Sequence, residues 1–458
     1  MRTTRRILDA DRTSAALALI AGLSALGAMT ASCSSSEGDA LPLDRGGDTR
    51  TDAEADGGNE DLTDAGPVDA ALVDAAPLTI TCETPPCALA LTTTLPSEGA
   101  ARDEGYCAIL TDGTVACWGT NKSRQLGDPA FTEPDSPIAV RVPGLSKITA
   151  LDHTCAVDED GAAFCWGSGP YLQSEAATAT VEASPVRLPL PGPARNVAIE
   201  PLAGCAILRD ASVVCWGTNG RQQVSADPTM YGKRNELPHA IPLAAGARDI
   251  AVSTATFTIH DDGRLSSWGA LPALGRPSAI PADGSPARVP LDHVTSVVTT
   301  GTEACAVAGG VGWCWGPPDV PAALSPNSNS RALPTAIDTP EPITRIATTV
   351  SRSVVLSSQL APVFEKRRWC AVGVSGDVYC WGLNNAGQAG DGTKDYALGT
   401  VRVTGLPAPA AEVKVMPYST CAILTNGKVY CWGNNASGQL GAGLPKGSFT
   451  APTEVILP

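Results

Sequence analysis

A tryptophan–glycine pair recurs seven times along this chain of 458 residues. In six of the seven cases a cysteine directly precedes the tryptophan, and a second cysteine lies nine or ten residues further upstream. Self-similarity at a period near fifty residues indicates one supersecondary unit repeated along the chain, as in solenoids and propellers. The tryptophans are separated by 47 to 66 residues and are Trp118, Trp166, Trp216, Trp268, Trp315, Trp381 and Trp432.

Each unit has the pattern of a β-hairpin. Pairing Cys107 with Cys117 sets Ile109 opposite Val115 and leaves a three-residue tip, 111–113, whose glycine supports a left-handed turn. In this register the cysteines face each other where antiparallel strands approach most closely, within reach of a disulfide. The expected bridges are Cys107–Cys117, Cys155–Cys165, Cys205–Cys215, Cys305–Cys314, Cys370–Cys380 and Cys421–Cys431.

The fourth unit supports pairing within a hairpin, because Phe257 and Ser267 replace both cysteines together. The alternative is that the cysteines are small buried residues without a bond. Cys82 and Cys87, which bracket a short proline-containing segment, form an expected seventh pair. Of the 15 cysteines this leaves Cys33 alone.

Cys33 ends a segment with the three parts of an export signal: early arginines, an apolar run and small residues. The sequence Thr-Ala-Ser-Cys at 30–33 resembles the lipobox of bacterial lipoproteins, so we expect residues 1–32 to be a signal peptide and Cys33 to be lipidated. The alternatives are an ordinary cleaved signal peptide and an uncleaved anchor. All three place the remaining chain outside the cytoplasm, where disulfides persist. We expect an outer-membrane or surface lipoprotein, or otherwise a secreted or periplasmic protein.

Residues 33–80 form an expected disordered acidic linker. The part from 34 to 80 has twelve acids against two arginines, and it lacks the apolar residues needed to offset the entropy of ordering. We interpret it as a soluble spacer; cation capture is the alternative. The chain has a formal net charge of −15, most of it in this linker. Residues 81–458 are therefore only mildly acidic and lack the basic field that nucleic-acid binding requires.

Residues 81–458 are predicted to form a single array, because an isolated hairpin cannot bury a core. A unit of about fifty residues has room for four short strands, which is one propeller blade. The predicted fold is thus all-β, a seven-bladed β-propeller preceded by the signal peptide and linker, with the tryptophans in its core. The last segment, 452–458, has the same position within the repeat unit as residues 137–143 have in the first unit. We expect it to complete the first blade and close the ring.

The residues after each tryptophan carry a further resemblance. The seventh unit continues Trp432-Gly-Asn-Asn-Ala-Ser-Gly-Gln-Leu-Gly, and the first Trp118-Gly-Thr-Asn-Lys-Ser-Arg-Gln-Leu-Gly. This resembles the repeat of the regulator of chromosome condensation family over about residues 88–458, although units two to five lack the Gln-Leu-Gly element. The resemblance implies a seven-bladed propeller. The nucleotide exchange and chromatin binding of the founding nuclear member are not expected here; a secreted bacterial relative that inhibits β-lactamases shows the fold as a binding disc.

No catalytic, cofactor-binding or metal site is expected. The four histidines lie in different units without a metal-binding spacing, and neither a nucleophile elbow nor a phosphate-cradling loop occurs. The function predicted is a monomeric binding or scaffold module for an unknown protein or glycan partner, with no nucleic acid and with membrane contact only through the N-terminal lipid. The alternatives are an extracytoplasmic hydrolase or lyase at the channel mouth and a purely structural envelope protein.

An insertion before the sixth hairpin, at about 353–368, combines apolar residues with a basic cluster. Such a combination is unusual in an acidic protein, so we predict a loop that contacts the partner. An extended strand pair is the alternative interpretation. The residues concerned are Val363, Phe364, Lys366, Arg367 and Arg368.

Overall fold

The computed structural model describes residues 75–95, 103–174, 176–233, 236–243, 246–316, 333–349, 352–354, 363–365 and 367–458. These residues belong to one compact unit. They are all-β apart from one short 3-10 turn, Pro228–Met230 (η1). The signal peptide and nearly all of the acidic linker lie outside the described residues.

Seven four-stranded antiparallel sheets follow one another along the chain, so the predicted seven-bladed propeller is confirmed. The first blade contains β1 (Ala88–Thr93), β2 (Gly105–Leu110), β3 (Val115–Thr120) and β4 (Asp135–Arg141), and the second β5 (Ile148–Asp152), β6 (Cys155–Asp158), β7 (Ala163–Gly169) and β8 (Thr180–Arg187). The third contains β9 (Ala194–Ile199), β10 (Ala203–Leu208), β11 (Val213–Gly217) and β12 (Glu236–Ile241), and the fourth β13 (Ala247–Val252), β14 (Ala255–His260), β15 (Leu265–Ala270) and β16 (Ala282–Arg288).

The fifth blade contains β17 (Val294–Thr300), β18 (Glu303–Ala308), β19 (Val311–Trp315) and β20 (Thr335–Ala336). The sixth contains β21 (Ile343–Thr348), β24 (Arg368–Gly373), β25 (Val378–Gly382) and β26 (Ala397–Arg402), and the seventh β27 (Ala410–Val415), β28 (Ser419–Leu424), β29 (Val429–Asn434) and β30 (Ser448–Glu454). Between β21 and β24 the chain forms a separate pair, β22 (Arg352–Val354) and β23 (Val363–Glu365).

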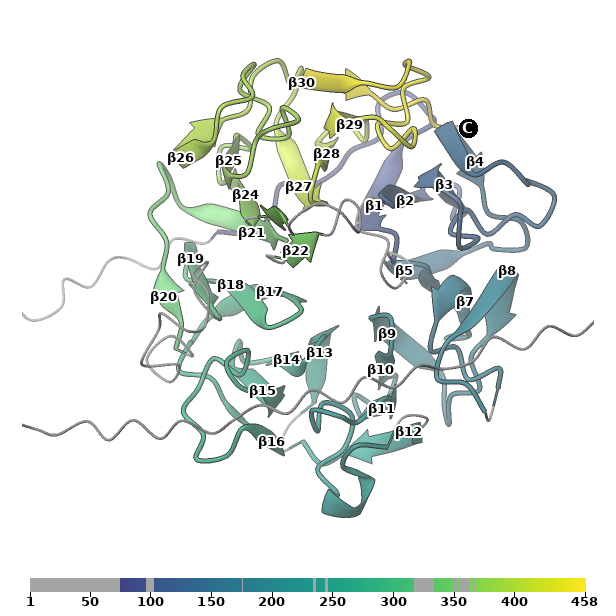
Figure 1. The fold of residues 1–458 in the computed structure, drawn as a ribbon, viewed down its shortest axis with the longest axis vertical. Coiled ribbons are helices and arrows are strands. Elements are labelled where there is room, and N and C mark those ends of the chain that lie inside the picture. The colour runs from purple at the N-terminus through teal and green to yellow at the C-terminus, as the bar shows by residue number, and fades with distance from the viewer. Residues whose placement is uncertain are drawn as a thin grey trace, which may run out of the picture. The chain divides into compact units, whose positions relative to one another are not determined.

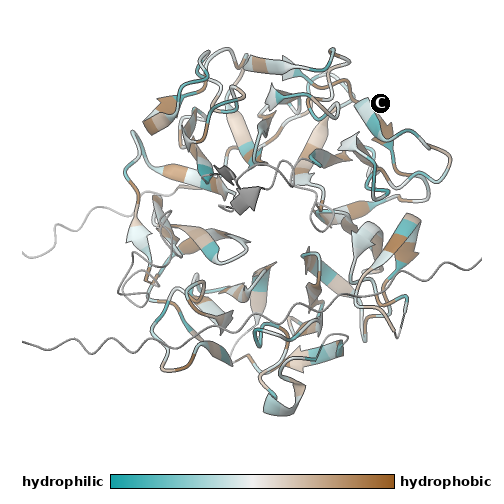
Figure 2. Ribbon diagram, in the orientation of Figure 1, coloured by the Kyte–Doolittle hydropathy of each residue, from teal (hydrophilic) through white to brown (hydrophobic). Residues whose placement is uncertain are grey.

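The first strands of the blades surround a central channel (Figure 1). Each of them packs against the first strand of the next blade, and β27 of the seventh blade packs against β1 of the first. Hydrophobic residues are spread over the strands of all the blades in Figure 2. The core is therefore distributed as one buried layer between each pair of blades, which is how a repeat array buries the faces of units that are unstable alone.

The hairpin between the second and third strands has the register expected from the sequence. Cys107 lies opposite Cys117 and Ile109 opposite Val115. The Cα atoms of the six hairpin cysteine pairs are 4.0 to 4.1 Å apart, as at non-hydrogen-bonded positions of an antiparallel ladder. All six pairs are bonded, and Cys82 is bonded to Cys87.

The fourth blade shows what replaces a disulfide. Phe257 lies opposite Ser267, in the register of the cysteine pairs elsewhere. The Phe257 ring is fully buried and meets the Trp315 ring of the fifth blade edge to face, with 5.6 Å between centroids. The Ser267 hydroxyl donates a hydrogen bond to the carbonyl oxygen of Leu274 at 2.6 Å. An aromatic contact between blades thus stands where the other units have a bond within a blade.

The expectation that the last strand completes the first blade is wrong. β30 pairs with β29 inside the seventh blade, while the first blade has four strands of its own, beginning with β1. The segments 452–458 and 137–143 do occupy equivalent positions in their repeat units, because β30 and β4 are the outer strands of their respective sheets. Equivalent phase, however, does not show which sheet a terminal strand joins, and a strand near in sequence was available for both.

Seven equivalent hydrogen bonds join the blades instead. The carbonyl oxygen of each hairpin-tip residue accepts a bond from the first backbone N–H of the next blade, at 2.8 to 3.4 Å. The bond from Ala88 N to Gly427 O, at 2.8 Å, repeats this contact between the seventh blade and the first. Beyond β30, Ile456 accepts a bond from Ala139 N, and Val455 is buried in the core shared by these blades. The ring therefore closes by the contact that joins every other pair of blades.

The tryptophans make a second connection of the same kind. Six of the seven indoles donate to a backbone carbonyl of the preceding blade, at 2.6 to 3.1 Å. Trp118 of the first blade donates to Gln439 of the seventh. The glycine of each Gln-Leu-Gly element permits this approach: a Cβ atom on Gly127 would lie 2.7 Å from the Trp166 ring, and one on Gly441 would lie 2.8 Å from Trp118. The recurring positions of the repeat motif thus form the contact between neighbouring blades.

Candidate functional site

All seven blades contribute to a cavity of about 330 Å³ at one end of the channel. Its lining comes from the turns that connect the first and second strands of the blades. We call this cavity the channel mouth; it is lined by Thr93–Leu95, Asp103, Glu104, His153, Ile199–Pro201, Val252, Ser253, Thr299–Gly301, Thr348, Thr349 and Val415–Pro417. The opposite end of each first strand lies beside the hairpin tips, since Ala88 pairs with Leu110. The mouth and the hairpin tips therefore occupy opposite faces.

Below the mouth, a second cavity of about 290 Å³ follows the channel between the first strands. Its charged groups are engaged with one another or with the backbone. Asp152 accepts a bond from Ile199 N at 2.8 Å, and Asp249 accepts one from the Asn196 amide at 3.0 Å. The Lys414 ammonium lies 3.0 Å from Glu412. The polar groups just described in the channel wall thus have their partners within the wall itself.

Burial sets the ionisation of these channel groups. It raises the pKa of Asp249, although a bond from the backbone of Ile250 opposes the rise. Burial alone would lower the pKa of Lys414, but the carboxylates of Glu412 and Asp152 outweigh it and leave that pKa raised. Lys414 thus stays charged in the channel because carboxylates surround it.

Three carboxyl groups line the mouth, and two of them are engaged. Asp103 forms an ion pair with Lys122, with 2.6 Å between Nζ and Oδ1. Glu104 is buried and accepts bonds at 2.7 Å from the backbone N–H of Tyr418 and from the Ser419 hydroxyl. Both partners of Glu104 belong to the seventh blade. Glu104 therefore joins the first blade to the seventh, whereas the ion pair of Asp103 lies within the first blade.

Glu200, in the turn after β9, is the third carboxyl group. It is half-buried, and burial raises the pKa of its side chain to about 7. Its carboxylate makes no hydrogen bond or ion pair with the described residues. Among these residues, no lysine or arginine lines the mouth. A carboxyl group that ionises near neutral pH, without a partner, is a candidate for ligand contact.

The one histidine at the mouth is already engaged. The Nδ1 atom of His153 lies 2.9 Å from the carbonyl oxygen of Thr93 and 3.2 Å from its hydroxyl. This contact joins the second blade to the first. The other histidines lie elsewhere, as the sequence suggested: His239 is on β12, His260 on β14, and His293 just before β17.

The loop predicted to contact a partner has a different structure from the one expected. Val363 and Phe364 belong to β23, which pairs with β22, so the alternative of a strand pair holds for these residues. Lys366 lies outside the described residues. Arg367 is 8% exposed and forms an ion pair with Glu303 of the fifth blade, at 3.0 Å. Arg368 is buried as well, with 1% of its surface exposed. Two of the five residues are thus held within the propeller.

Arg368 is a bridge between blades rather than a contact residue. Its guanidinium donates to the backbone oxygens of Met416, Ser419 and Gln388, at 2.6 to 3.0 Å. Burial lowers its pKa to about 10, and burial also raises the pKa of the neighbouring Tyr106 phenol. The sequence suggested that Arg367 and Arg368 are exposed to solvent, because most adjacent basic residues are. In the structure, the packing of neighbouring blades instead provides acceptors for their guanidinium groups.

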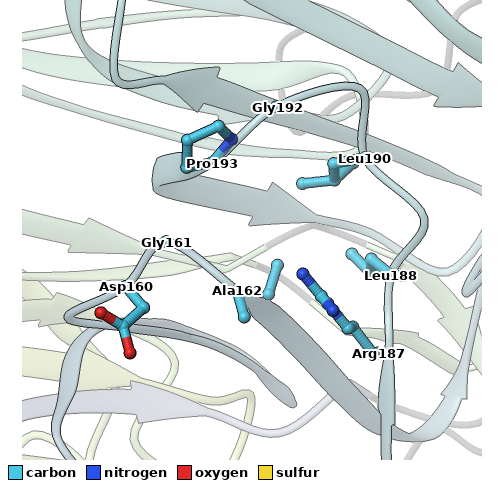
Figure 3. A pocket seen from close by; sticks show the side chains of 9 residues that line it. Asp160, Gly161, Ala162, Arg187, Leu188, Leu190, Gly192 and Pro193 are labelled. Carbon is cyan, nitrogen blue, oxygen red and sulfur yellow. The ribbon is translucent and has the colours of Figure 1, made fainter.

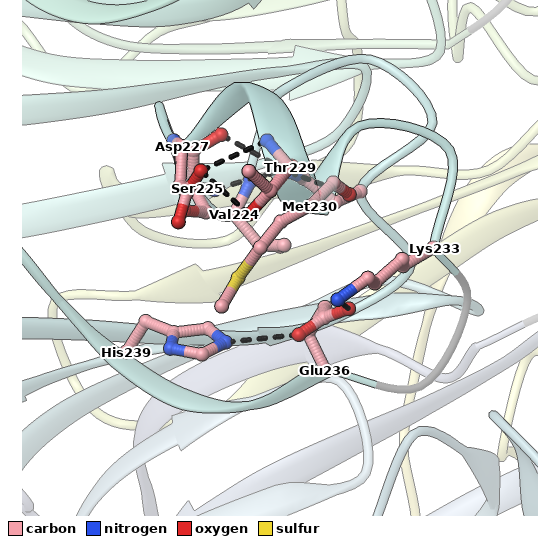
Figure 4. A network of polar contacts seen from close by, with 9 residues as sticks. Val224, Ser225, Asp227, Thr229, Met230, Lys233, Glu236 and His239 are labelled. Carbon is pink, nitrogen blue, oxygen red and sulfur yellow. Dashed lines mark hydrogen bonds and ion pairs between the residues drawn. The ribbon is translucent and has the colours of Figure 1, made fainter.

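Two other polar features lie at the periphery. A pocket lies between the hairpin tip at Asp160 and Gly161 and the connection at Leu190–Pro193, and the side chains of Arg187 and Leu188 also line it (Figure 3). On β12, the outer strand of the third blade, His239 Nε2 lies 3.2 Å from Glu236 (Figure 4). No cluster of three or more metal-ligating side chains occurs in the part of the chain that the structure describes. Neither feature assembles a reactive group.

A family model describing the regulator of chromosome condensation (RCC1) repeat matches residues 151–173 and 417–439. These segments contain Trp166 and Trp432 with the residues that follow them. These two segments are therefore similar to RCC1 repeats.

Solved structures resemble this propeller in fold. Human WBSCR16 is 17% identical with a TM-score of 0.60, and covers 75% of this chain and 95% of its own. Prp20p from Saccharomyces cerevisiae is 17% identical with a TM-score of 0.57, and covers 75% of this chain and 86% of its own. The yeast RCC1 (Prp20) bound to Kap60 is 17% identical with a TM-score of 0.59, over 75% and 84% of the two chains. At this identity the likeness concerns the fold.

The RCC1 element extends further than the sequence comparison suggested. In the third unit, Asn219 Oδ1 accepts a bond from Val224 N, as Asn121 does from Leu126 N in the first. Gln223 then offers its carbonyl oxygen to Trp268 at 2.9 Å. The spacing from Trp216 to Gln223 equals the spacing from Trp118 to Gln125 in the first unit. This spacing is the sequence feature from which the motif of the third unit could have been predicted.

Seven disulfides are typical of proteins outside the reducing cytosol. Cys33, the predicted lipidation site, lies outside the described residues. No helix among the residues that the structure describes has the length and apolar character to cross a bilayer.

Proposed function

We propose that this RCC1-repeat protein is an exported, envelope-anchored binding module that holds a protein partner at its channel mouth and catalyses no reaction itself. The observation that carries the proposal is the construction of the mouth, to which all seven blades contribute. The rest of the repeat is occupied by contacts between blades. The mouth combines a cavity, apolar side chains and a carboxyl group without a partner, as protein-binding sites do.

The proposal includes the location. The hairpin disulfides require an oxidising compartment. A lipid on Cys33 would attach the protein to a membrane, and the acidic linker would hold the propeller away from the membrane surface. Replacing Cys33 by alanine should move the protein from the membrane fraction to the soluble fraction. An unchanged distribution would contradict lipid anchoring.

Two of these solved propellers have named protein partners. Prp20p is described with its binding properties to Gsp1p and histones, and yeast RCC1 is described bound to Kap60. These statements concern those proteins. They support protein binding as a use of this fold; the partner of the present chain is a separate question.

Two matched substitutions test which face binds. Leu202, beside the mouth, is 37% exposed, and Val311, at a hairpin tip on the opposite face, is 39% exposed. With the soluble propeller as bait for envelope extracts, Leu202→Arg should abolish retention of a partner and Val311→Arg should leave it unchanged. Loss with Val311→Arg alone would place the contact on the other face, and no retained protein with any variant would favour a structural role.

A further inference from the structure

The mouth has the charge of a site for a cation. Its three carboxyl groups are Asp103, Glu104 and Glu200, and no lysine or arginine among the described residues lines it. Lys122 neutralises Asp103, while Glu104 is engaged with the seventh blade. The Glu200 carboxylate has no hydrogen-bond or ion-pair partner among the residues that the structure describes. Lys414, a cation of the channel wall, is already paired with Glu412.

Two threonines add oxygen atoms that lack partners. Thr94 and Thr300 line the same cavity from the first and fifth blades. Thr94 is fully buried, and neither hydroxyl oxygen has a hydrogen-bond partner among the described residues. A buried polar oxygen left unpaired costs free energy, so a ligand that donates hydrogen bonds gains from meeting it. An ammonium group carries three donors and no acceptor.

Much of the remaining lining is apolar. Leu95, Ile199, Val252 and Met416 are buried, and they contribute carbon atoms from four different blades. A cavity of about 330 Å³ has room for one long side chain but not for a strand or helix. A lysine matches such a site, because its four methylene groups pack against apolar walls while its ammonium reaches a polar group.

We propose that the channel mouth binds the side chain of a lysine presented by the protein partner, with the ammonium held by the Glu200 carboxylate. This inference rests on the proposed function and specifies the chemistry of the partner. A cation bound beside Glu200 would replace the water that the half-buried carboxylate has partly lost. It would also give the acidic propeller electrostatic selectivity for a basic segment of its partner.

Capped tripeptides provide the probe. Acetyl-Gly-Lys-Gly-amide should bind the full disulfide-bonded protein with one-to-one stoichiometry in isothermal titration calorimetry. The norleucine analogue, which keeps the stem but lacks the charge, should bind at least about tenfold more weakly, as expected for loss of a charge-assisted hydrogen bond. Equal affinity of the two peptides would overturn the proposal, and so would tighter binding of the arginine analogue.

Substitution of the acid locates the contact. Glu200→Gln should weaken binding of the lysine peptide at least about tenfold, whereas Glu133→Gln, an exposed acid outside the cavity, should leave it within about twofold. Both variants should retain the melting temperature of the parent to within a few degrees. An unchanged affinity in Glu200→Gln would overturn the assignment.

Proton release gives a readout that a structural defect would not imitate. Glu200 is largely protonated at pH 6, because its pKa is raised to about 7. Binding of the ammonium should ionise it and release close to one proton at pH 6 but little at pH 8, measured from the dependence of the binding enthalpy on the buffer. Glu200→Gln should remove this release; release that persists in the variant would contradict the site.

The two levels of the proposal fail differently. If the propeller retains a partner equally well with Glu200→Gln and without it, the lysine contact is wrong and the binding function stands. If the lysine peptide binds as expected but Leu202→Arg does not affect retention of the partner, the cavity takes an amine and the partner binds elsewhere; that outcome overturns the proposal as stated.

Discussion

The two faces of the propeller are built on opposite principles. On the face of the hairpin tips, seven units repeat the same backbone hydrogen bond to the next blade, with a glycine at the tip in six of them. On the face of the channel mouth, the equivalent turns differ in length and composition, and neighbouring blades meet through side chains that occur once, such as Glu104, His153 and Arg368. The regular face closes the ring, and the irregular face is free to specialise.

The comparison predicts that damage to the seam between the last and first blades has the largest effect. Val455 is 4% exposed and Leu457 packs against the same core, so deletion of residues 455–458 should cost roughly 3–5 kcal/mol. Ile456→Ala is the control, because its side chain is 52% exposed, and it should change the stability by less than about 0.5 kcal/mol. Both are measured by denaturant unfolding. A deletion variant as stable as the parent would mean that the seam does not depend on these contacts.

A smaller loss should follow from crowding one hairpin tip. A Cβ atom on Gly427 would lie 2.6 Å from the Cβ of Cys87, and its φ is +80°, whereas Gly144 has a φ of +79° with no atom within 4 Å. Gly427→Ala should therefore cost about 3 kcal/mol, and Gly144→Ala about 1 kcal/mol from backbone strain alone. Thermal melts of the two variants isolate the steric part. Equal losses would contradict the tight seam.

The six hairpin disulfides occupy the same register position in their blades, so their removal should have similar effects from blade to blade. Replacing Cys107 and Cys117 together by alanine should cost about 2–3 kcal/mol, since the bridge closes a loop of about ten residues in the unfolded chain. The pair Cys155 and Cys165 should behave alike. Unfolding midpoints of the two double variants test this, and a difference above about 1 kcal/mol would show that the blades are less equivalent than their geometry.

The smallest effect on stability is expected at the channel mouth, where we assign Glu200 to ligand binding rather than to packing. The pKa of Glu200 is raised to about 7 in the folded protein, above the value of about 4.3 expected in an unfolded chain. The folded state therefore binds more protons between these values, and this group lowers stability as the pH rises from about 4.5 to 7. Glu200→Gln should remove this decline of stability with pH, as measured by denaturant unfolding at pH values between about 4.5 and 7. A steeper pH dependence in the variant would contradict the raised pKa.

Local features of the fold could be predicted because they depend on residues close in sequence. The length of the hairpin tip and the alternation of a strand determine which residues face each other across ten positions, so Cys107 and Cys117 could be paired from spacing alone. The double replacement by Phe257 and Ser267 supported the same register. The count of seven blades followed from the seven Trp-Gly pairs, because each blade contains one third strand.

Features that join distant residues could not be predicted in this way. The motif of the third unit was overlooked because Gln223 is followed by valine and serine instead of leucine and glycine, although the spacing was retained. Arg367 and Arg368 were expected at the surface, since nothing near them in sequence could neutralise two guanidinium groups. Their acceptors come from Glu303, which is 64 residues from Arg367, and from the turn at Met416, which is 48 residues from Arg368.

The sequence by itself determined the repeat, the number of blades, the hairpin register and the cysteine pairs, because turn length and strand alternation act over about ten residues. Only the tertiary structure decided how the ring closes and what its mouth contains. The last strand stays with its own hairpin, because pairing with a neighbour in the chain needs no long loop to be closed. The mouth exists only when seven turns, each about fifty residues from the next, are brought around one channel, and Glu200 meets its surroundings only there.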